Sequence, residues 1–197
     1  MRKILIVDDR IQRQMEFLPG QAEDVKKIDA MPQVRNAVGD QYTKFIDDIE
    51  NNNLIEILGY DLWVFHRSLL VTRKLLNKVQ GLAKEHGKAL ILFSGGVTFS
   101  TYSQGEFPLL ILNSQGFYSD RLIGFLKKFS EDADTKIIEV IYGENWQLTY
   151  LFKYRQILQG VVYPGNARET MEELESALGE LDLPAVNKKI DNILLGI

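Results

Sequence analysis

The sequence has no cysteine and only two histidines, His66 and His86, among its 197 residues. Without cysteine the chain can form neither a disulfide nor a thiolate metal site. The absence of cysteine also gives no information on whether the protein's compartment is oxidising or reducing. Two histidines are too few for a zinc site built from several histidine ligands. These absences exclude disulfide frameworks and multi-histidine zinc centres.

The chain also lacks a long apolar run and a large excess of one charge. No apolar stretch approaches the ~18 residues that suggest a membrane span, and residues 1–7 are too short a leader for a signal peptide. The net charge of −4 gives no broad field that would attract nucleic acid. Residues 143–197 carry eight acids against five bases, which opposes phosphate contacts. We therefore expect a cytoplasmic protein with no nucleic-acid or membrane partner.

The hydrophobic residues are concentrated in short apolar segments that alternate with amphipathic ones. The apolar segments predict strands at 3–7, 60–66, 89–93 and 109–112, with a weak edge strand at 24–30 and an extra edge strand at 136–142. Helical spacing of apolar residues predicts helices at 10–18, 34–58, 69–86, 120–129, 144–158, 166–178 and 184–195.

This alternation of strands and helices predicts right-handed βαβ units and a parallel sheet covered by helices on both faces. We predict a doubly wound α/β sheet of strand order 2-1-3-4-5, extended by the strand at 136–142. Residues 1–130 are expected to form the α/β domain. Residues 131–197 are expected to add the extra strand and a helical C-terminal extension, packed on or next to that domain.

The central apolar segment, residues 60–66, is typical of a strand that is buried on both faces of a parallel sheet. Open α/β sheets bind ligands at the carboxyl ends of such strands, and here that position is His66. His66 is therefore a candidate ligand sensor, phosphohistidine or partner contact. The alternative is a histidine that is hydrogen bonded at a strand end and has no further role.

Four short motifs occur in a fixed order along the chain, ILIVDD at 4–9, DLWVFH at 61–66, FSG at 93–95 and LLILN at 109–113. Together they resemble the receiver domain of response regulators over roughly residues 1–130. The resemblance implies a flavodoxin-like fold and a pocket at the carboxyl edge of the sheet. The residues at the pocket positions are Asp8, Asp9, His66, Ser94 and Asn113.

Two groups that a receiver needs for phosphorylation are replaced in this chain. His66 stands where the family has its phospho-acceptor aspartate, and Asn113 or Ser114 stands where it has a lysine. Metal and lysine neutralise the charge of the transferring phosphoryl group, so the family's reaction is not expected here. The resemblance then implies a pseudo-receiver. This would be a non-enzymatic signalling or adaptor module that acts through a protein partner or a second copy, with residues 117–129 as the contact face.

The acidic pair leaves two alternatives open. Asp8 and Asp9 offer oxygen ligands for a residual Mg²⁺, but two carboxylates without a third make a weak site, and we expect no cofactor. One of them could instead cap the first helix. A protonated His66 in contact with an aspartate would replace the metal and lock the pocket in one signalling state.

Two further segments suggest other functions. The run Ser94-Gly95-Gly96 resembles the phosphate loop of ATP pyrophosphatases, which predicts a nucleotide-binding enzyme as the alternative function. The aspartate of that motif is absent, so a simple turn explains the run equally. The aromatic residues that begin at Trp146 are either a docking surface, as in a subunit of a larger complex, or part of the core.

Overall fold

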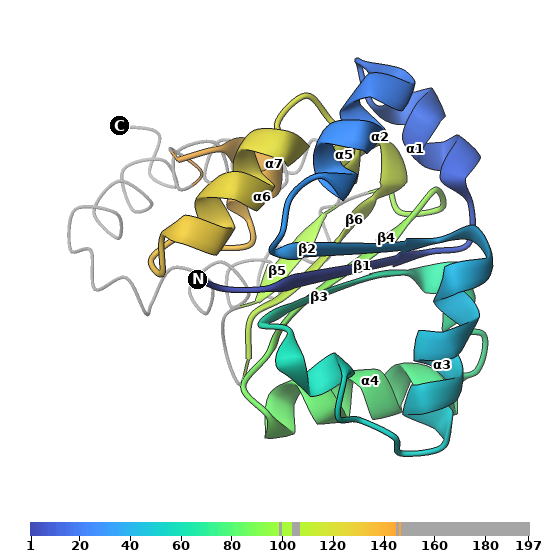
Figure 1. Ribbon diagram of the computed structural model, residues 1–197. Helices are drawn as coiled ribbons and strands as arrows, with labels where there is room; N and C mark the ends of the chain where they lie inside the picture. Colours follow the sequence, from blue (N-terminus) through green and yellow to red (C-terminus); the bar gives the residue numbers. More distant parts are fainter. Residues whose placement is uncertain (99, 104–106, 145, 147–197) are drawn as a thin grey trace, which may run out of the picture.

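A computed structural model describes residues 1–98, 100–103, 107–144 and 146. They form a six-stranded sheet of order β2-β1-β3-β4-β6-β5, in which five strands are parallel and β5 runs antiparallel to β6 (Figure 1). The strands are β1 (Ile4–Asp8), β2 (Val34–Val38), β3 (Leu62–His66), β4 (Ala89–Ser94), β5 (Thr101–Ser103) and β6 (Leu109–Asn113).

Helices cover both faces of the sheet, as the alternating pattern predicts. Figure 1 shows α3 and α4 on one side, and α1, α2, α5, α6 and α7 on the other. The α-helices are α1 (Ile11–Phe17), α2 (Gln21–Asp29), α3 (Tyr42–Glu50), α4 (Arg73–Glu85), α5 (Ser114–Phe117), α6 (Leu122–Glu131) and α7 (Glu139–Tyr142). Short 3-10 helices are η1 (Gly39–Gln41), η2 (Ile57–Gly59) and η3 (Arg67–Leu69).

The central strands β1 and β3 are buried along their whole length. Their side chains alternate between two hydrophobic cores, one on each face of the sheet. Ile4 and Ile6 join the core beneath α1, α2 and α6, whereas Leu5 and Val7 join the core beneath α3 and α4. The prediction of strands buried on both faces is confirmed.

The second strand was predicted in the wrong place. Residues 24–30 form the end of helix α2 rather than an edge strand, and β2 lies in the segment predicted as the start of a helix. Val25 and Ile28 are three positions apart, a spacing that also fits one face of a helix. The sequence of β2, VRNAV, buries only Ala37 fully, so this edge strand carries little of the apolar signal of the central strands.

The extra edge strand predicted at 136–142 is also wrong, because this segment is a turn followed by helix α7. Glu139 accepts a hydrogen bond from the backbone N–H of Lys136 at 2.9 Å, which fixes the first turn of the helix. The edge position beside β6 is taken by β5, from a stretch predicted to be polar and irregular. The predicted strand order therefore describes the five parallel strands alone, with β6 counted as the fifth.

The apolar residues described from position 137 onward belong to the same core as the parallel strands. Ile137, Ile138 and Val140 are buried in it, and the ring of Trp146 contacts that of Tyr102 with centroids 5.7 Å apart. Trp146 is thus a core residue. The helices predicted at 166–178 and 184–195, and all but the start of the one at 144–158, lie outside the described residues.

Among the described residues, none of the helices combines the length and the apolar character that crossing a membrane requires.

The packing of α7 and its N-cap residue Ile138 can be tested with two matched substitutions. Ile138 is fully buried and Ile55 is 87% exposed. Ile138→Ala should lower the free energy of unfolding by about 2–5 kcal/mol, because it leaves a cavity in the core. Ile55→Ala should change it by less than about 0.5 kcal/mol. Urea unfolding measures both, and equal effects would contradict the placement of α7 in the core.

Candidate functional site

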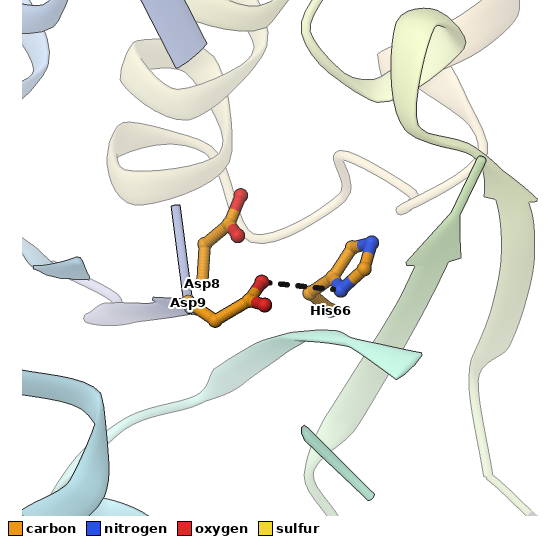
Figure 2. A group of neighbouring side chains, drawn as sticks. All are labelled: Asp8, Asp9 and His66. Carbon is orange, nitrogen blue, oxygen red and sulfur yellow. Dashed lines mark ion pairs between the residues drawn. The ribbon is translucent and has the colours of Figure 1, made fainter. Parts of the chain in front are cut away.

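The candidate site lies at the carboxyl ends of β1 and β3, where the sequence predicts it. Asp8 ends β1, Asp9 follows it, and His66 ends β3 (Figure 2). One ligand atom from each of the three side chains lies within 4.8 Å of the others. The structure thus brings together three of the five residues predicted for the pocket.

Asp8 is completely buried, and its carboxylate is surrounded by donors. Its Oδ1 atom accepts hydrogen bonds from the backbone N–H of Arg10, at 3.1 Å, and from the guanidinium of Arg13. Its Oδ2 atom accepts a 2.7 Å hydrogen bond from the Tyr118 hydroxyl. A buried carboxylate requires such partners, because an unpaired charge in the core is strongly unfavourable.

Arg13 supplies the cation of the site, a role that was not predicted from the sequence. It lies on α1, and the same Nη1 atom donates to Oδ1 of Asp8 and to Oδ1 of Asp9, the latter at 2.9 Å. Only 12% of the Arg13 side chain is exposed. The guanidinium therefore bridges the two carboxylates from within the fold.

The two carboxylates differ in acidity because their surroundings differ. Burial raises the pKa of Asp8, and the hydrogen bonds from Tyr118 and Arg10 offset this only in part. Burial also disfavours the charged form of Asp9, but the hydrogen bond and the positive charge that Arg13 supplies favour that form, and the pKa of Asp9 is lowered. Asp9 is thus the more acidic member of the pair.

His66 is neutral at neutral pH in this environment. Its side chain is 7% exposed, and its Nδ1 atom is hydrogen bonded to the Ser68 hydroxyl and lies 3.5 Å from Oδ1 of Asp9. Burial and the nearby charge of Arg13 lower the pKa of His66 to about 4, although Asp9 acts in the opposite direction. The cation that contacts the acidic pair is Arg13, and a protonated histidine is not needed for that purpose.

Asn113 and Ser94 shape the neighbouring loop rather than the acidic pair. The Asn113 side chain donates to the backbone carbonyls of Gly95, at 3.2 Å, and Val97, at 2.9 Å. Its Oδ1 accepts from the backbone N–H of Gln115 and caps α5. Asn113 therefore ties the 94–97 turn to the end of β6.

A polar network runs from Asp8 through the buried Tyr118 and Gln14 to the edge of the sheet. Gln14 is fully buried on α1, and its Nε2 atom lies 3.2 Å from the Tyr118 hydroxyl and 2.9 Å from Oδ1 of Asn36. Asn36 in turn donates to Oδ1 of Asp29 at 2.8 Å. The spacing of Ile11, Gln14 and Leu18 places the glutamine on the inward face of the helix, which is the sequence signal that could have revealed it.

Comparison of the chain with protein-family models, with curated protein sequences and with solved structures found no match.

The donor set does not fit a divalent metal ion while Arg13 bridges the carboxylates. Asp8 has both of its oxygens occupied by donors, and Oδ1 of Asp9 contacts Arg13. A second guanidinium, that of Arg10, lies 3.7 Å from Oδ2 of Asp9. A metal ion would have to displace a cation that the fold already provides, against the repulsion of both arginines.

Two arginines near the pair make a matched test of the buried bridge. Arg13→Met should lower the free energy of unfolding by about 2–4 kcal/mol, because Asp8 stays buried without its cation. Arg10→Met should change it by less than about 1 kcal/mol, since that side chain is 70% exposed. Chemical denaturation measures both, and the double variant Asp8→Asn/Arg13→Met should recover part of the loss. A similar cost for the two arginines would refute the bridge.

The lowered pKa of His66 predicts a pH dependence of stability. The unfolded chain takes up a proton on this histidine near pH 6.5, whereas the folded protein does so only near pH 4, so acid favours unfolding. The free energy of unfolding should fall by on the order of 2–3 kcal/mol across that window. His66→Gln should remove this component of the slope. His86→Gln, at an exposed position, should retain it, and a slope unchanged in His66→Gln would show that His66 does not titrate as described.

Proposed function

We propose that this protein is a non-catalytic, receiver-like signalling or adaptor module that works through protein contacts without aspartyl phosphorylation. The observation that carries the proposal is the Arg13 guanidinium, which bridges Asp8 and Asp9 in the position where a receiver holds its metal ion. An arginine fixed by a buried carboxylate cannot exchange as Mg²⁺ does. The acidic pair therefore has a permanent counter-charge.

The geometry at the end of β3 supports the same conclusion. His66 stands in place of the acceptor carboxylate, and its Nδ1 atom is hydrogen bonded to Ser68. Asn113, in place of the lysine, is engaged by the 94–97 turn. Phosphoryl transfer depends on positioned cations around the transferring group. The nucleophile, the exchangeable metal and the lysine are each replaced by a residue with a local structural role.

The arrangement of the parallel strands also supports a receiver-like scaffold. Without β5, the sheet has the order β2-β1-β3-β4-β6, which corresponds to the flavodoxin-like order of five strands. The acidic pair and His66 then lie at the point where the strand order reverses. A module that keeps this scaffold and loses the chemistry retains its surfaces. We propose that α6, with Gly124 and Lys127 exposed and the exposed Arg121 as its N-cap residue, is part of the surface that contacts a partner.

The alternative of a nucleotide-binding enzyme has less support in the loop that would carry it. A phosphate loop requires free backbone N–H groups. In the 94–97 turn the N–H of Gly96 donates to the Ser94 side chain at 3.4 Å, and that of Val97 donates to the Ser94 carbonyl at 3.3 Å. These amides already have acceptors within the turn.

A thermal-shift series on the purified protein tests the proposal. The protein is compared in buffer, with Mg²⁺, with Mg²⁺ and beryllofluoride, and with Mg²⁺ and ATP, since a ligand that binds only the folded state raises the melting temperature. No shift is expected in any condition. The double variant Arg13→Ala/His66→Asp, which removes the internal cation and restores an acceptor carboxylate, should gain a shift with Mg²⁺ and beryllofluoride.

Two outcomes would reject the proposal. A shift of the unaltered protein with Mg²⁺ and beryllofluoride, together with Mg²⁺-dependent phosphorylation by a small phosphodonor, would mean that the pocket still carries out the chemistry. A shift with ATP that is lost in Gly95→Val or Gly96→Val would support the nucleotide-binding alternative instead.

A further inference from the structure

Strand β2 forms one edge of the sheet, and the two edges differ. At one edge the short antiparallel strand β5 covers β6. At the other edge β2 pairs with β1, and among the described residues no strand covers its outer side (Figure 1). Natural proteins protect such edges with charged residues, above all lysine, with proline or with a bulge. The sequence of β2, VRNAV, has no lysine or proline, and its one charge is that of Arg35. The open edge therefore has the hydrogen-bonding capacity to accept another strand.

The register with β1 decides which backbone groups face outward. The N–H of Ile4 donates to the carbonyl of Gln33 at 2.8 Å. Backbone groups alternate in direction along a strand, so residues 33, 35 and 37 face β1, whereas Val34, Asn36 and Val38 face the open edge. Three residues thus present the groups that an added strand would meet.

Some of these outward groups already have partners. The N–H of Val34 donates to the carbonyl of Met31 at 3.0 Å. The carbonyl of Val38 accepts the first hydrogen bond of η1, because Val38 is the N-cap of that helix. Within the part of the chain that the structure describes, four outward groups have no such partner: the carbonyl of Val34, both groups of Asn36 and the N–H of Val38.

We propose that β2 is an interface with a second copy of this chain, paired antiparallel about a two-fold axis at Asn36. In that register the N–H of each Val38 meets the carbonyl of Val34 in the other copy, and the two Asn36 residues exchange a pair of hydrogen bonds. These hydrogen bonds use all four of the outward backbone groups that still need a partner. They do not require the N–H of Val34 or the carbonyl of Val38, which already have one. An isologous interface requires this kind of self-complementarity.

The side chains fit the same register. Val34 lies opposite Val38 of the second copy on one face of the sheet, and Arg35 lies opposite Ala37 on the other. No two like charges face each other directly, and the apolar pairs stand at both ends of the ladder. The side chain of Asn36, at the two-fold axis, is held by Gln14 and Asp29, which orders the middle of the edge.

The described residues leave this edge accessible. A hollow of about 330 Å³ runs beside it and is lined by Val34, Asn36 and Val38 together with Ile11, Asp29 and Gln41. A foreign extended peptide could use the same edge, but it would not need the match between Val34 and Val38 that the chain itself provides. The inference depends on β2 alone and not on the chemistry of the acidic pair.

Cysteine cross-linking tests the register directly, because the chain has no cysteine of its own. Arg35 and Ala37 of the two copies form a non-hydrogen-bonded pair with Cα atoms about 4.5 Å apart, which is a separation that a disulfide can bridge. A 1:1 mixture of the full-length Arg35→Cys and Ala37→Cys variants should give a disulfide-linked dimer under mild oxidation. A mixture of Lys74→Cys and Ala37→Cys, which loses the same charge at an exposed position on α4, should give at least tenfold less.

Sedimentation of the unaltered protein over a concentration series is the second measurement. We expect a dimer whose dissociation constant rises about tenfold or more in Val38→Pro, since this substitution removes one outward N–H from each copy. The melting temperature of that variant shows whether it has folded. If it has not, the cross-linking of the cysteine variants still tests whether β2 forms the interface. A protein that stays monomeric and gives no selective cross-link would overturn the proposal. So would a dimer that cross-links no better through Arg35→Cys than through Lys74→Cys, or a monomer whose edge binds only an added extended peptide.

Discussion

The buried carboxylate of Asp8 places the strongest constraint on this structure. A charge at the end of a fully buried strand is unfavourable unless donors surround it, and here the donors come from α1 and from Tyr118. Arg13 fixes the orientation of α1 over the sheet, and Tyr118 fixes the chain that follows β6. The same contacts that stabilise Asp8 hold the elements that close one face of the sheet.

This constraint also explains the asymmetry of the two cores. The core beneath α3 and α4 is closed by apolar side chains such as Phe45 and Val79. The core beneath α1, α2 and α6 is bordered by a polar network that runs from Tyr118 through Gln14 to Asn36 on the edge strand β2. Polar networks of this kind specify a single arrangement when every member is satisfied. One face of the sheet is thus fixed by shape and the other by hydrogen bonding as well.

Much of the fold can be predicted from the sequence, and the reasons for the failures are physical. The strands in the segments 3–7, 60–66 and 89–93 are buried on both faces and are therefore nearly all apolar. The segment 109–112 is apolar as well, although Leu109 and Ile111 are only partly buried. The edge strands β2 and β5 escape prediction because one side of each is exposed. The predicted strand at 136–142 shows the converse error, since an apolar run as short as this fits a helix equally well.

The candidate site, too, can be predicted from the sequence only in part. Asp8, Asp9 and His66 can be placed together from sequence because parallel strands bring their carboxyl ends to one edge. The roles of Arg13 and Tyr118 depend on the orientation of side chains from a helix and from a distant segment. No local pattern reports such orientations, so the partner that decides the chemistry of the pair is visible only in the structure.

The hydrogen bond between Tyr118 and Asp8 joins residues 110 positions apart, and Arg2 reaches the carbonyl of Phe129 across 127 positions. Contacts of such sequence separation form late in folding, because the entropy of closing a long loop must be overcome before the contact contributes. During synthesis on the ribosome, β1 emerges long before Tyr118 does. Until then Asp8 lacks one of its donors, and burying it remains costly. The carboxylate therefore delays the final closure of this face until the chain through α5 has been made.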